Sequence, residues 1–442
     1  MKMSTLAVHR YRLQLGLIHL AVAMTLVPIN STLNRIMIKE MGFAAVVVAA
    51  LASLPYLASP VQVFIGGYAD QHPIWGFRRT PYILAGLALC ALGMALTPHA
   101  AALMQERGVW GAPIAIVMFG LWGMGYNLAT VSYFSLLSER FPAPTRGRAV
   151  AVMMVMMIVG IIATSVALSR MLEPYTFDAL ITAFRRIGWV ALVLGGIGLL
   201  GLEPKLPPTR QAGGNASGEA RRWKETAAML AQDPLVRRFF LYLLLLLTAL
   251  LAQDVLLEPF AAEAFHMPVH VTTRITAIWG LCFLITLLVG GWLETRVAKG
   301  VLAQTGNGMA LAGFLLIIVA GVLAHQPLFY LGLVVLGSGS GLSTVSNMSL
   351  MFDFTPTGKV GLYMGVWGMA SALSRWMGSI GGGLIRDVVS QVLAAPVYGY
   401  LFVFGLEAAL LGLAIYLLPR VPVRQEAGEL VLNVWERAAV QE

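Results

Sequence analysis

The stretch GGYAD at residues 66–70, followed after a short turn by GFRRTP at residues 76–81, joins two long apolar segments. A similar stretch, GGWLE at residues 290–294, ends another apolar run and is again followed by basic residues, Arg296 and Lys299. The subtraction 290 − 66 gives an offset of 224 residues, which is too long for a solenoid repeat and about half of this 442-residue chain. The sequence therefore predicts a body made of two similar halves.

The composition is that of a polytopic membrane protein. Hydrophobic residues make up 58% of the chain and charged residues 12%, with a mean hydropathy of +0.78, whereas soluble domains carry about 25% charged residues. Apolar stretches of roughly helical length recur along the chain, and the third and the sixth are shorter than the rest. The twelve stretches are Leu15–Met37, Phe43–Ile65, Pro81–Thr97, Ala112–Leu137, Gly147–Ser169, Ile187–Leu202, Phe239–Ala262, Thr272–Leu293, Val301–Ala324, Leu328–Phe352, Val360–Ile385 and Pro396–Leu418.

A second repeated pattern supports the two halves. An acid, a proline and a glycine follow the fourth stretch at positions 139, 142 and 147, and the same three follow the tenth at 353, 356 and 361, an offset of 214. We therefore expect an all-α polytopic membrane protein with twelve transmembrane helices in two pseudo-symmetric six-helix bundles. The bundles are residues 1–202 and 239–418, joined by a polar linker at 203–238 and followed by a tail at 419–442.

The distribution of basic residues predicts the orientation. Of the 30 Lys and Arg residues, 21 fall on the side that carries both termini and the linker, which places these segments in the cytoplasm. The net charge of +9 follows from this bias and from attraction to anionic lipid head groups, so it gives no reason to expect a nucleic-acid partner.

Polar side chains inside the first and seventh apolar stretches are candidates for a cavity or gate. Asn30 and Asn34 are four residues apart and share a helix face, and adding 224 to these positions gives Asp254 and Glu258. One interpretation is hydrogen bonding between packed helices. The other is a pathway or gate, because polar clusters inside membrane spans tend to mark pathways.

Other polar residues near the middle of spans belong to the same candidate set. Arg375 and Glu407 lie near mid-membrane by residue count, and each needs a partner or a water-filled cavity. Asp254 and Glu407 are both possible partners for Arg375. Asn127 and Asn347, in the fourth and tenth stretches, complete the set of candidate cavity or gate residues.

The sequence contains no signature of catalysis or of a metal site. We find no aspartate-rich prenyl-diphosphate motif, phosphate loop, nucleotide fingerprint or zinc signature. Cys90 and Cys282 both lie inside apolar stretches, where they act as small hydrophobic residues. We therefore expect that the chain is not an enzyme and holds no metal.

The repeated glycine and acid–arginine loops resemble those of the major facilitator superfamily. Gly66 and Asp70 match the superfamily pattern Gly-x-x-x-Asp, whereas Gln71 and His72 replace its next basic residue. Three segments, TLNRIMI at 32–38, the loop at 70–82 and GLYMGVWG at 361–368, look like the bacteriochlorophyll delivery branch of that superfamily, the PucC and LhaA group. The resemblance extends from about Leu15 to Leu418.

The resemblance implies a major facilitator-type fold and a role in light-harvesting complex assembly. Its implied partners are light-harvesting polypeptides and bacteriochlorophyll, bound or transferred, in a bacterial inner or intracytoplasmic photosynthetic membrane. The alternative is a secondary transporter, proton-coupled through Asp254 or Glu258, for a small or amphipathic solute. A magnesium pigment accepts an imidazole ligand most simply, and His19 is the one histidine within a predicted span, but no histidine spacing identifies a pigment site.

The superfamily architecture also implies two conformational elements. In that superfamily, a loop like the one that contains Gly66, Asp70, Arg78 and Arg79 holds the two halves in one conformation. The first and seventh helices approach each other across the pseudo-twofold axis, so we predict that Arg35 contacts Glu258, or else Asp254, and closes the external side. The competing interpretation is that Arg35 reaches out to lipid phosphates.

Overall fold

The computed structural model describes residues 5–57, 61–141, 143–205, 234–353 and 360–418. Nearly all of these residues are helical, and the β pairing found among them is one isolated bridge between Ile74 and Phe77. In chain order the elements are α1 (Thr5–Met24), η1 (Pro28–Leu33), α2 (Asn34–Lys39), α3 (Ala45–Ala52), α4 (Leu54–Leu57), α5 (Val61–Gln71), α6 (Thr80–Arg107), η2 (Gly108–Gly111), α7 (Ala112–Arg140), α8 (Ala143–Met171), α9 (Phe177–Leu199), α11 (Pro234–Ala252), η3 (Gln253–Val255), α12 (Leu257–Ala264), α13 (Val269–Leu293), α14 (Lys299–Val322), α15 (Gln326–Asp353), α16 (Val360–Val392) and α17 (Pro396–Leu417).

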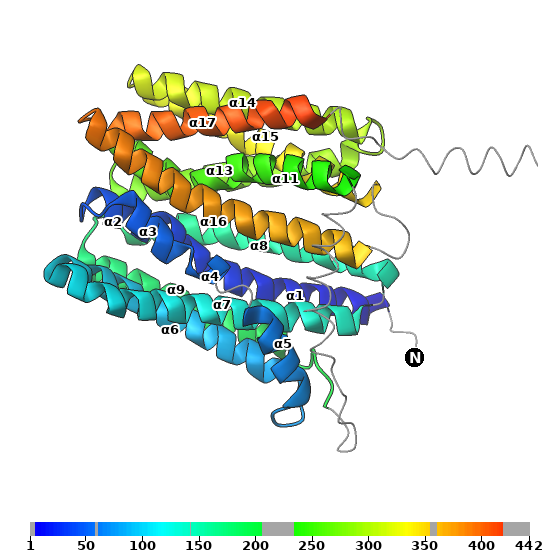
Figure 1. Cartoon of the computed structure of the whole chain (residues 1–442). Helices are drawn as coiled ribbons and strands as arrows, with labels where there is room; N and C mark the ends of the chain where they lie inside the picture. Colours follow the sequence, from blue (N-terminus) through cyan, green and yellow to red (C-terminus); the bar gives the residue numbers. More distant parts are fainter. Residues whose placement is uncertain (1–4, 58–60, 142, 206–233, 354–359, 419–442) are drawn as a thin grey trace, which may run out of the picture.

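The helices form two groups, α1–α9 and α11–α17, that lie one above the other in Figure 1. Where the groups meet, α8 packs against α13, α3 against α16, and α2 against α12. The approach of α16 to the start of α3 is close enough to require glycine: a Cβ on Gly383 would lie 2.9 Å from the backbone nitrogen of Val46. These three pairs, together with smaller contacts of α4 with α16 and of η1 with α13, form the interface between the halves.

The chain is a multi-pass membrane protein. Among the described residues, nine stretches are long and apolar enough to cross a membrane, and one of them, Thr80–Arg140, contains both α6 and α7. The predicted total of twelve spans stays a prediction. The third and sixth spans, however, are longer than predicted, because α6 continues through Pro98 to Arg107 and α9 begins at Phe177 rather than near Ile187.

Two spans change helix type at matching places. The first span passes from α1 into the π-helical turn η1, which begins at Pro28, and then into α2. Adding 224 to 28 gives 252, the last residue of α11, and the 3₁₀ turn η3 begins at the next residue, Gln253. Proline lacks a backbone N–H and cannot continue the α-helical hydrogen-bond ladder, which accounts for the change at Pro28. In both halves this change of helix type surrounds the polar residues that the sequence singled out.

The molecule has two distinct ends, which we name here. The linker end carries residues 72–79, the junction of α7 and α8, and residues 200–205; at this end Arg140 Nε donates to the carbonyl of Leu202 at 2.7 Å. The far end carries residues 40–44, 108–111, 172–176 and 265–268. The linker end lies on the right of Figure 1 and the far end on the left.

The structure describes only the two edges of the predicted linker at 203–238, and the division of the chain into these units stays a prediction. Glu203 is buried, with 8% of its surface exposed, and α11 already begins at Pro234. The centre of the linker and the tail at 419–442 lie outside the described residues.

Candidate functional site between the halves

A reciprocal pair of contacts joins the first and seventh spans. The hydroxyl of Ser31 donates to the carboxylate of Glu258, and the side-chain amide of Asn34 donates to the backbone carbonyl of Val255. Adding 224 to 31 gives 255 and adding 224 to 34 gives 258, so each contact is the twofold counterpart of the other. The pseudo-twofold axis therefore passes between η1 and η3.

Glu258 is held by hydroxyl groups. It is 3% exposed, and besides Ser31 it accepts a hydrogen bond from Thr276 Oγ1 at 2.6 Å. Close by, the hydroxyls of Thr32 and Thr273 lie 3.3 Å apart. Neutral donors from both halves therefore surround a buried carboxyl group.

The predicted contact of Arg35 with Glu258 or Asp254 is wrong. Arg35 is buried, forms an ion pair with Glu40, and donates from Nη2 to the carbonyl of Met267 at 3.0 Å. The physical reason is that Glu258 already has two hydroxyl donors, whereas Glu40 follows Arg35 by only five residues. The bond to Met267 still joins the two halves at the far end, so Arg35 does not reach out to lipid.

The far end carries further links of the same kind. Lys39 and Glu263, again 224 residues apart, form an ion pair between α2 and α12. Partial burial raises the pKa of the nearby Tyr175 hydroxyl, and the charge of Glu40 adds to that shift.

Two acids at equivalent positions link the outer helices of the interface. Asp387 in α16 accepts the backbone N–H groups of Ala45 at 3.0 Å and Val46 at 2.9 Å, at the start of α3. Glu173, which is 214 positions before Asp387, lies 3.7 Å from the imidazole of His270 and 3.5 Å from the guanidinium of Arg274 on α13. Each half thus contributes one acid that contacts the start of a helix in the other half.

Two serines complete this seam between α8 and α13. Ser169 Oγ donates to the carbonyl of His270 at 2.7 Å and accepts from Arg274 Nε at 2.7 Å. Ser165 donates to the carbonyl of Thr273. We call this whole set, with the Ser31, Arg35, Lys39 and Asp387 contacts, the far-end seam.

Arg375 pairs with Asp254, which selects between the two partners that the sequence left open. The two side chains are 2.9 Å apart, and each keeps 33% of its surface exposed. The guanidinium lies 5.5 Å from the ring centroid of Tyr56 on α4, in the other half. Tyr126 on α7 lies near enough to interact electrostatically with Arg375. An ion pair and two phenol rings therefore face one another between the halves.

Glu407 on α17 is 2% exposed, and neither of its carboxylate oxygens has a hydrogen-bond partner among the described residues. It lies near enough to Asp254 to interact with it electrostatically. A buried carboxyl group that accepts no hydrogen bond is costly to ionise.

The two predicted asparagines make contacts within their own halves. Asn127 donates to the carbonyls of Pro55 at 2.9 Å and Gly123 at 3.0 Å. Asn347 accepts from the hydroxyl of Tyr242 and donates to the carbonyl of Ser343 at 2.7 Å. Asn30 contributes its backbone carbonyl, which accepts from Asn34 at 3.2 Å. Asn127 and Asn347 therefore form hydrogen bonds between helices of their own halves, and their assignment to a cavity or gate stays a prediction.

The repeated loop at the linker end is held by two acids. Arg79 forms an ion pair with Glu139 at 2.9 Å. Glu203 accepts the backbone N–H groups of Arg78, Arg79 and Thr80 at 2.7 to 3.1 Å, and so caps the start of α6.

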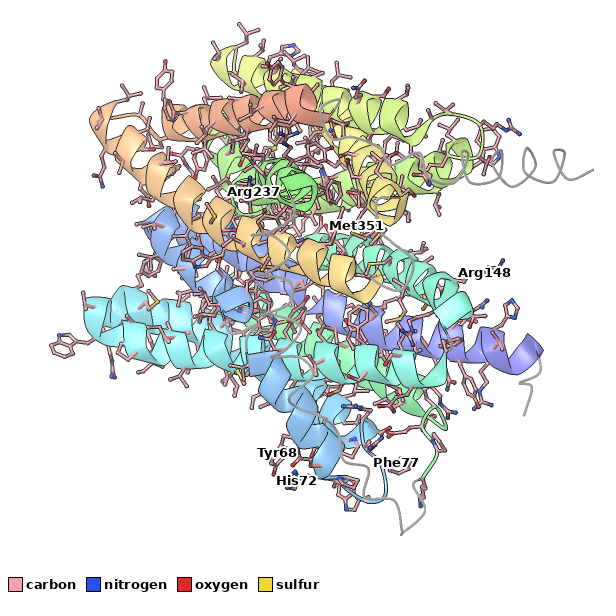
Figure 2. The ribbon with its side chains drawn as sticks, turned by 45° about the vertical axis from the view of Figure 1, so that its right-hand side comes forward. Tyr68, His72, Phe77, Arg148, Arg237 and Met351 are labelled. Atoms are coloured by element: carbon pink, nitrogen blue, oxygen red, sulfur yellow. The ribbon has the colours of Figure 1, made fainter. Side chains whose placement is uncertain are left out.

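The turn before α6 is tight, because Trp75 and Gly76 both have positive φ, 53° and 79°, as in the favoured two-residue turns. The rings of Tyr68 and His72 stack with their centroids 4.1 Å apart. Figure 2 labels both side chains and Phe77 of this turn at the same end of the molecule. Gly66 and Asp70 lie in α5, and the side chain of Asp70 is outside the described part of the structure. The latch role of this loop stays a prediction.

Sequence reasoning missed several residues of the site, namely Ser31, Lys39, Glu173, Glu203, Glu263, Thr276 and Asp387. Four of these residues could have been found from the repeat, because the offset of 224 links Lys39 to Glu263 and the offset of 214 links Glu173 to Asp387. Among the residues that the structure describes, no group of three or more His, Cys, Asp or Glu side chains could hold a metal ion.

A profile of the PUCC protein family matches residues 32–426, which is most of the chain. The chain belongs to the PucC protein family. It is 29% identical over 424 residues to Protein PucC of Cereibacter sphaeroides, covering 93% of this chain and 92% of the relative. It is also 29% identical over 418 residues to the "Bacteriochlorophyll synthase 44.5 kDa chain" of Rhodobacter capsulatus, covering 90% and 92%.

Solved structures of other proteins share the fold of this PucC-family chain. A D-xylose–proton symporter aligns with a TM-score of 0.71 at 15% identity, over 95% of this chain and 99% of the symporter. A bacterial homologue of the iron transporter ferroportin, in its inward-facing state, aligns with a TM-score of 0.68 at 13% identity, over 95% and 99%. The fold is therefore that of the major facilitator superfamily, as the sequence predicts.

Proposed function

We propose that this PucC-family protein is an assembly factor for bacterial light-harvesting complexes, which binds bacteriochlorophyll and delivers it to newly inserted antenna polypeptides. Family membership supports a role linked to bacteriochlorophyll, because one relative is named as a chain of bacteriochlorophyll synthase. The pigment is the cargo of this activity.

The observation that carries the proposal is the Arg375–Asp254 pair beside Tyr56 and Tyr126. A bacteriochlorophyll is a flat apolar ring with carbonyl oxygens at its edge. Phenol rings offer apolar faces with hydroxyl donors, and a guanidinium offers several N–H donors. Both members of the ion pair keep a third of their side-chain surface exposed between two apolar halves, so they remain accessible to such a cargo.

His19 is a weaker candidate for holding the pigment. The residue is 6% exposed, and the centroid of its ring lies 5.2 Å from that of Tyr133 and 5.8 Å from that of Phe134. This low exposure disfavours the approach of a magnesium ion inside a broad macrocycle. We therefore assign recognition to the Arg375 region.

Purification in mild detergent tests the proposal directly. The wild-type chain, expressed in a pigment-producing host, should carry bacteriochlorophyll absorption and should copurify with antenna polypeptides. The variant Arg375→Gln should lose most of the bound pigment, whereas Arg107→Gln, an exposed arginine in the last turn of α6, should retain it. Pigment-free wild-type protein, or equal pigment in both variants, would contradict the proposal.

The alternative function is secondary transport of a small or amphipathic solute. The observation that favours it is a pair of acids on the seventh span, the buried Glu258 and the partly exposed Asp254, in a fold shared with a proton symporter. Solute flux into liposomes, driven by a proton gradient and abolished by Glu258→Gln, together with no bound pigment, would support transport over escort.

We further propose that the protein performs no catalysis and acts in the bacterial inner or intracytoplasmic photosynthetic membrane, with both termini cytoplasmic. An escort acts after the pigment has been made. Deletion of the gene should therefore lower the amount of light-harvesting complex while bacteriochlorophyll synthesis continues. Accumulation of a pigment precursor in the deletion strain would instead indicate an enzyme.

A further inference from the structure

A hollow at the far end lies between the end of α8 and the first half of α9. Its volume is about 260 Å³, and Met171, Asp178, Ala179, Thr182, Ala183 and Arg186 line it. The hollow is on the outside of the first helix group, because Asp178 and Arg186 are both exposed. It is separate from the far-end seam, whose contacts lie between the two halves.

The polar residues of the hollow are arranged in order along one face of α9. Asp178, Thr182 and Arg186 are spaced four residues apart, so their side chains follow one another on the same face. Asp178 is nearest the far end and Arg186 is innermost. Among the described residues, neither the side chain of Asp178 nor that of Arg186 has a hydrogen bond or ion pair, so both charges are available to a ligand.

The same face continues as an apolar stripe toward the linker end. Val190, Val193 and Ile197 follow Arg186 at helical spacing and are 47%, 57% and 47% exposed. Trp189 beside them is 69% exposed. The face of α9 thus presents an acid, a hydroxyl, a cation and then a continuous apolar strip.

The depth of Arg186 favours a contact with an anion. From Arg186 to the end of α9 at Leu199 is 13 residues, or about 20 Å of helix, which is less than the roughly 30 Å of a bilayer's hydrocarbon core. An exposed guanidinium at this level either extends to the head groups or pairs with an anion close to it. Thr182 and Asp178 lie above it, toward the head groups, so the guanidinium can reach an anion held in the hollow.

We propose that this hollow binds one phospholipid whose head group carries both a phosphate and a primary ammonium, as in phosphatidylethanolamine. The phosphate pairs with Arg186, the ammonium pairs with Asp178, and an acyl chain lies along Val190, Val193 and Ile197. The order of charges on α9 matches the order in this lipid, in which the ammonium is outermost, the phosphate follows and the acyl chains are innermost.

The acid in the hollow makes the site selective among lipids. A phosphatidylglycerol head group offers hydroxyl donors but no positive charge to balance Asp178. A phosphatidylcholine head group has the charge but no N–H donor, because its nitrogen is fully methylated. Only the primary ammonium supplies a charge-assisted hydrogen bond to the carboxylate.

Native mass spectrometry of the full-length chain in mild detergent tests the assignment. The protein is mixed with equal amounts of dioleoyl phosphatidylethanolamine, phosphatidylcholine and phosphatidylglycerol. The amount of phosphatidylethanolamine that the wild-type protein retains should be about five times that of either other lipid. One charge-assisted contact accounts for a difference of this size. Arg186→Gln should lower retention of all three lipids, and Asp178→Asn should bring the ratio close to one.

Arg185→Gln is the matched control, because Arg185 is exposed at the same depth on a neighbouring face of α9 and does not line the hollow. Equal losses in Arg185→Gln and Arg186→Gln, or no lipid preference in wild type, would overturn the site. If Arg186→Gln does not purify as a folded protein, the lipid ratio of Asp178→Asn alone decides. Competition by soluble phosphoethanolamine at millimolar concentration would mean that the hollow binds a free phosphate compound and not a lipid, which would also overturn the assignment.

Discussion

Lys39 and Glu263 occupy the same position in the two halves of the protein, 224 residues apart, and they form an ion pair with each other. In a twofold arrangement, only residues next to the axis can contact their own counterparts. Here one counterpart is basic and the other acidic, so the pair attracts where two identical residues would repel. This relationship marks the axis at the far end and indicates that the far-end seam holds the halves together there.

Exchanging the charges of Lys39 and Glu263 should show how much this ion pair stabilises the closed far end. Lys39→Glu or Glu263→Lys alone places like charges together and should weaken closure by about 1 kcal/mol, or about fivefold, because the pair is partly exposed. The double exchange Lys39→Glu/Glu263→Lys should restore it. Spin labels at the far ends of α6 and α14 would measure the distance between halves. A double exchange no better than the single variants would show that the pair does not act directly.

Replacing both Arg375 and Asp254 should destabilise the protein less than replacing either one alone. Arg375→Gln or Asp254→Asn alone leaves one charge without a partner and should lower the stability of the purified protein by about 1 to 2 kcal/mol, given that each side chain is a third exposed. The double variant should recover much of this loss. Thermal unfolding of all three in one detergent would measure the coupling. Strictly additive losses would contradict it.

Loss of the carboxylate of Glu203 should destabilise the start of α6. Glu203→Ala removes the acceptor of three backbone N–H groups and of the Thr80 hydroxyl, which should cost about 1 to 2 kcal/mol. Glu106→Gln, an exposed acid in the last turn of the same helix, is the matched control and should have little effect. Hydrogen exchange at residues 78–83 would report the change. Unchanged protection in Glu203→Ala would exclude the cap.

Asp70→Asn tests the predicted latch role of the loop at the linker end. We expect the variant to insert normally but to support less antenna assembly, because it removes a charge close in sequence to Arg78 and Arg79. Membrane protein content and antenna absorption, measured in the same cells, separate the two effects. Antenna levels equal to those of wild type would favour a simple surface ion pair of little energetic importance.

A reporter fused at Gly214 tests the predicted orientation. The basic residues around the linker predict that this position faces the cytoplasm. A reporter that is active only in the cytoplasm should therefore be active at Gly214. Activity there of a reporter that works only outside the cell would reverse the topology and place the far end in the cytoplasm.

The sequence by itself determined the class of the protein and its internal repeat. Apolar stretches of membrane-spanning length require helices, because backbone polar groups in the bilayer must be hydrogen-bonded within the chain. The offset of 224 identified Asn30, Asn34, Asp254 and Glu258 as equivalent residues, and the structure brings their surroundings together at η1 and η3. Such local and periodic features can be predicted because they depend on residues that are close in the chain or repeated in it.

Only the tertiary structure decided which charges pair. Arg35 has a choice of acids at similar depth, and its partner is Glu40 because hydroxyls from Ser31 and Thr276 already occupy Glu258. Arg375 likewise pairs with Asp254, while Glu407 on α17 is left without a donor among the described residues. Residue counts give the depth of a side chain but not the direction in which it points. Because an ion pair or hydrogen bond depends on distances of a few ångström, helix rotation and packing between the halves select the partners.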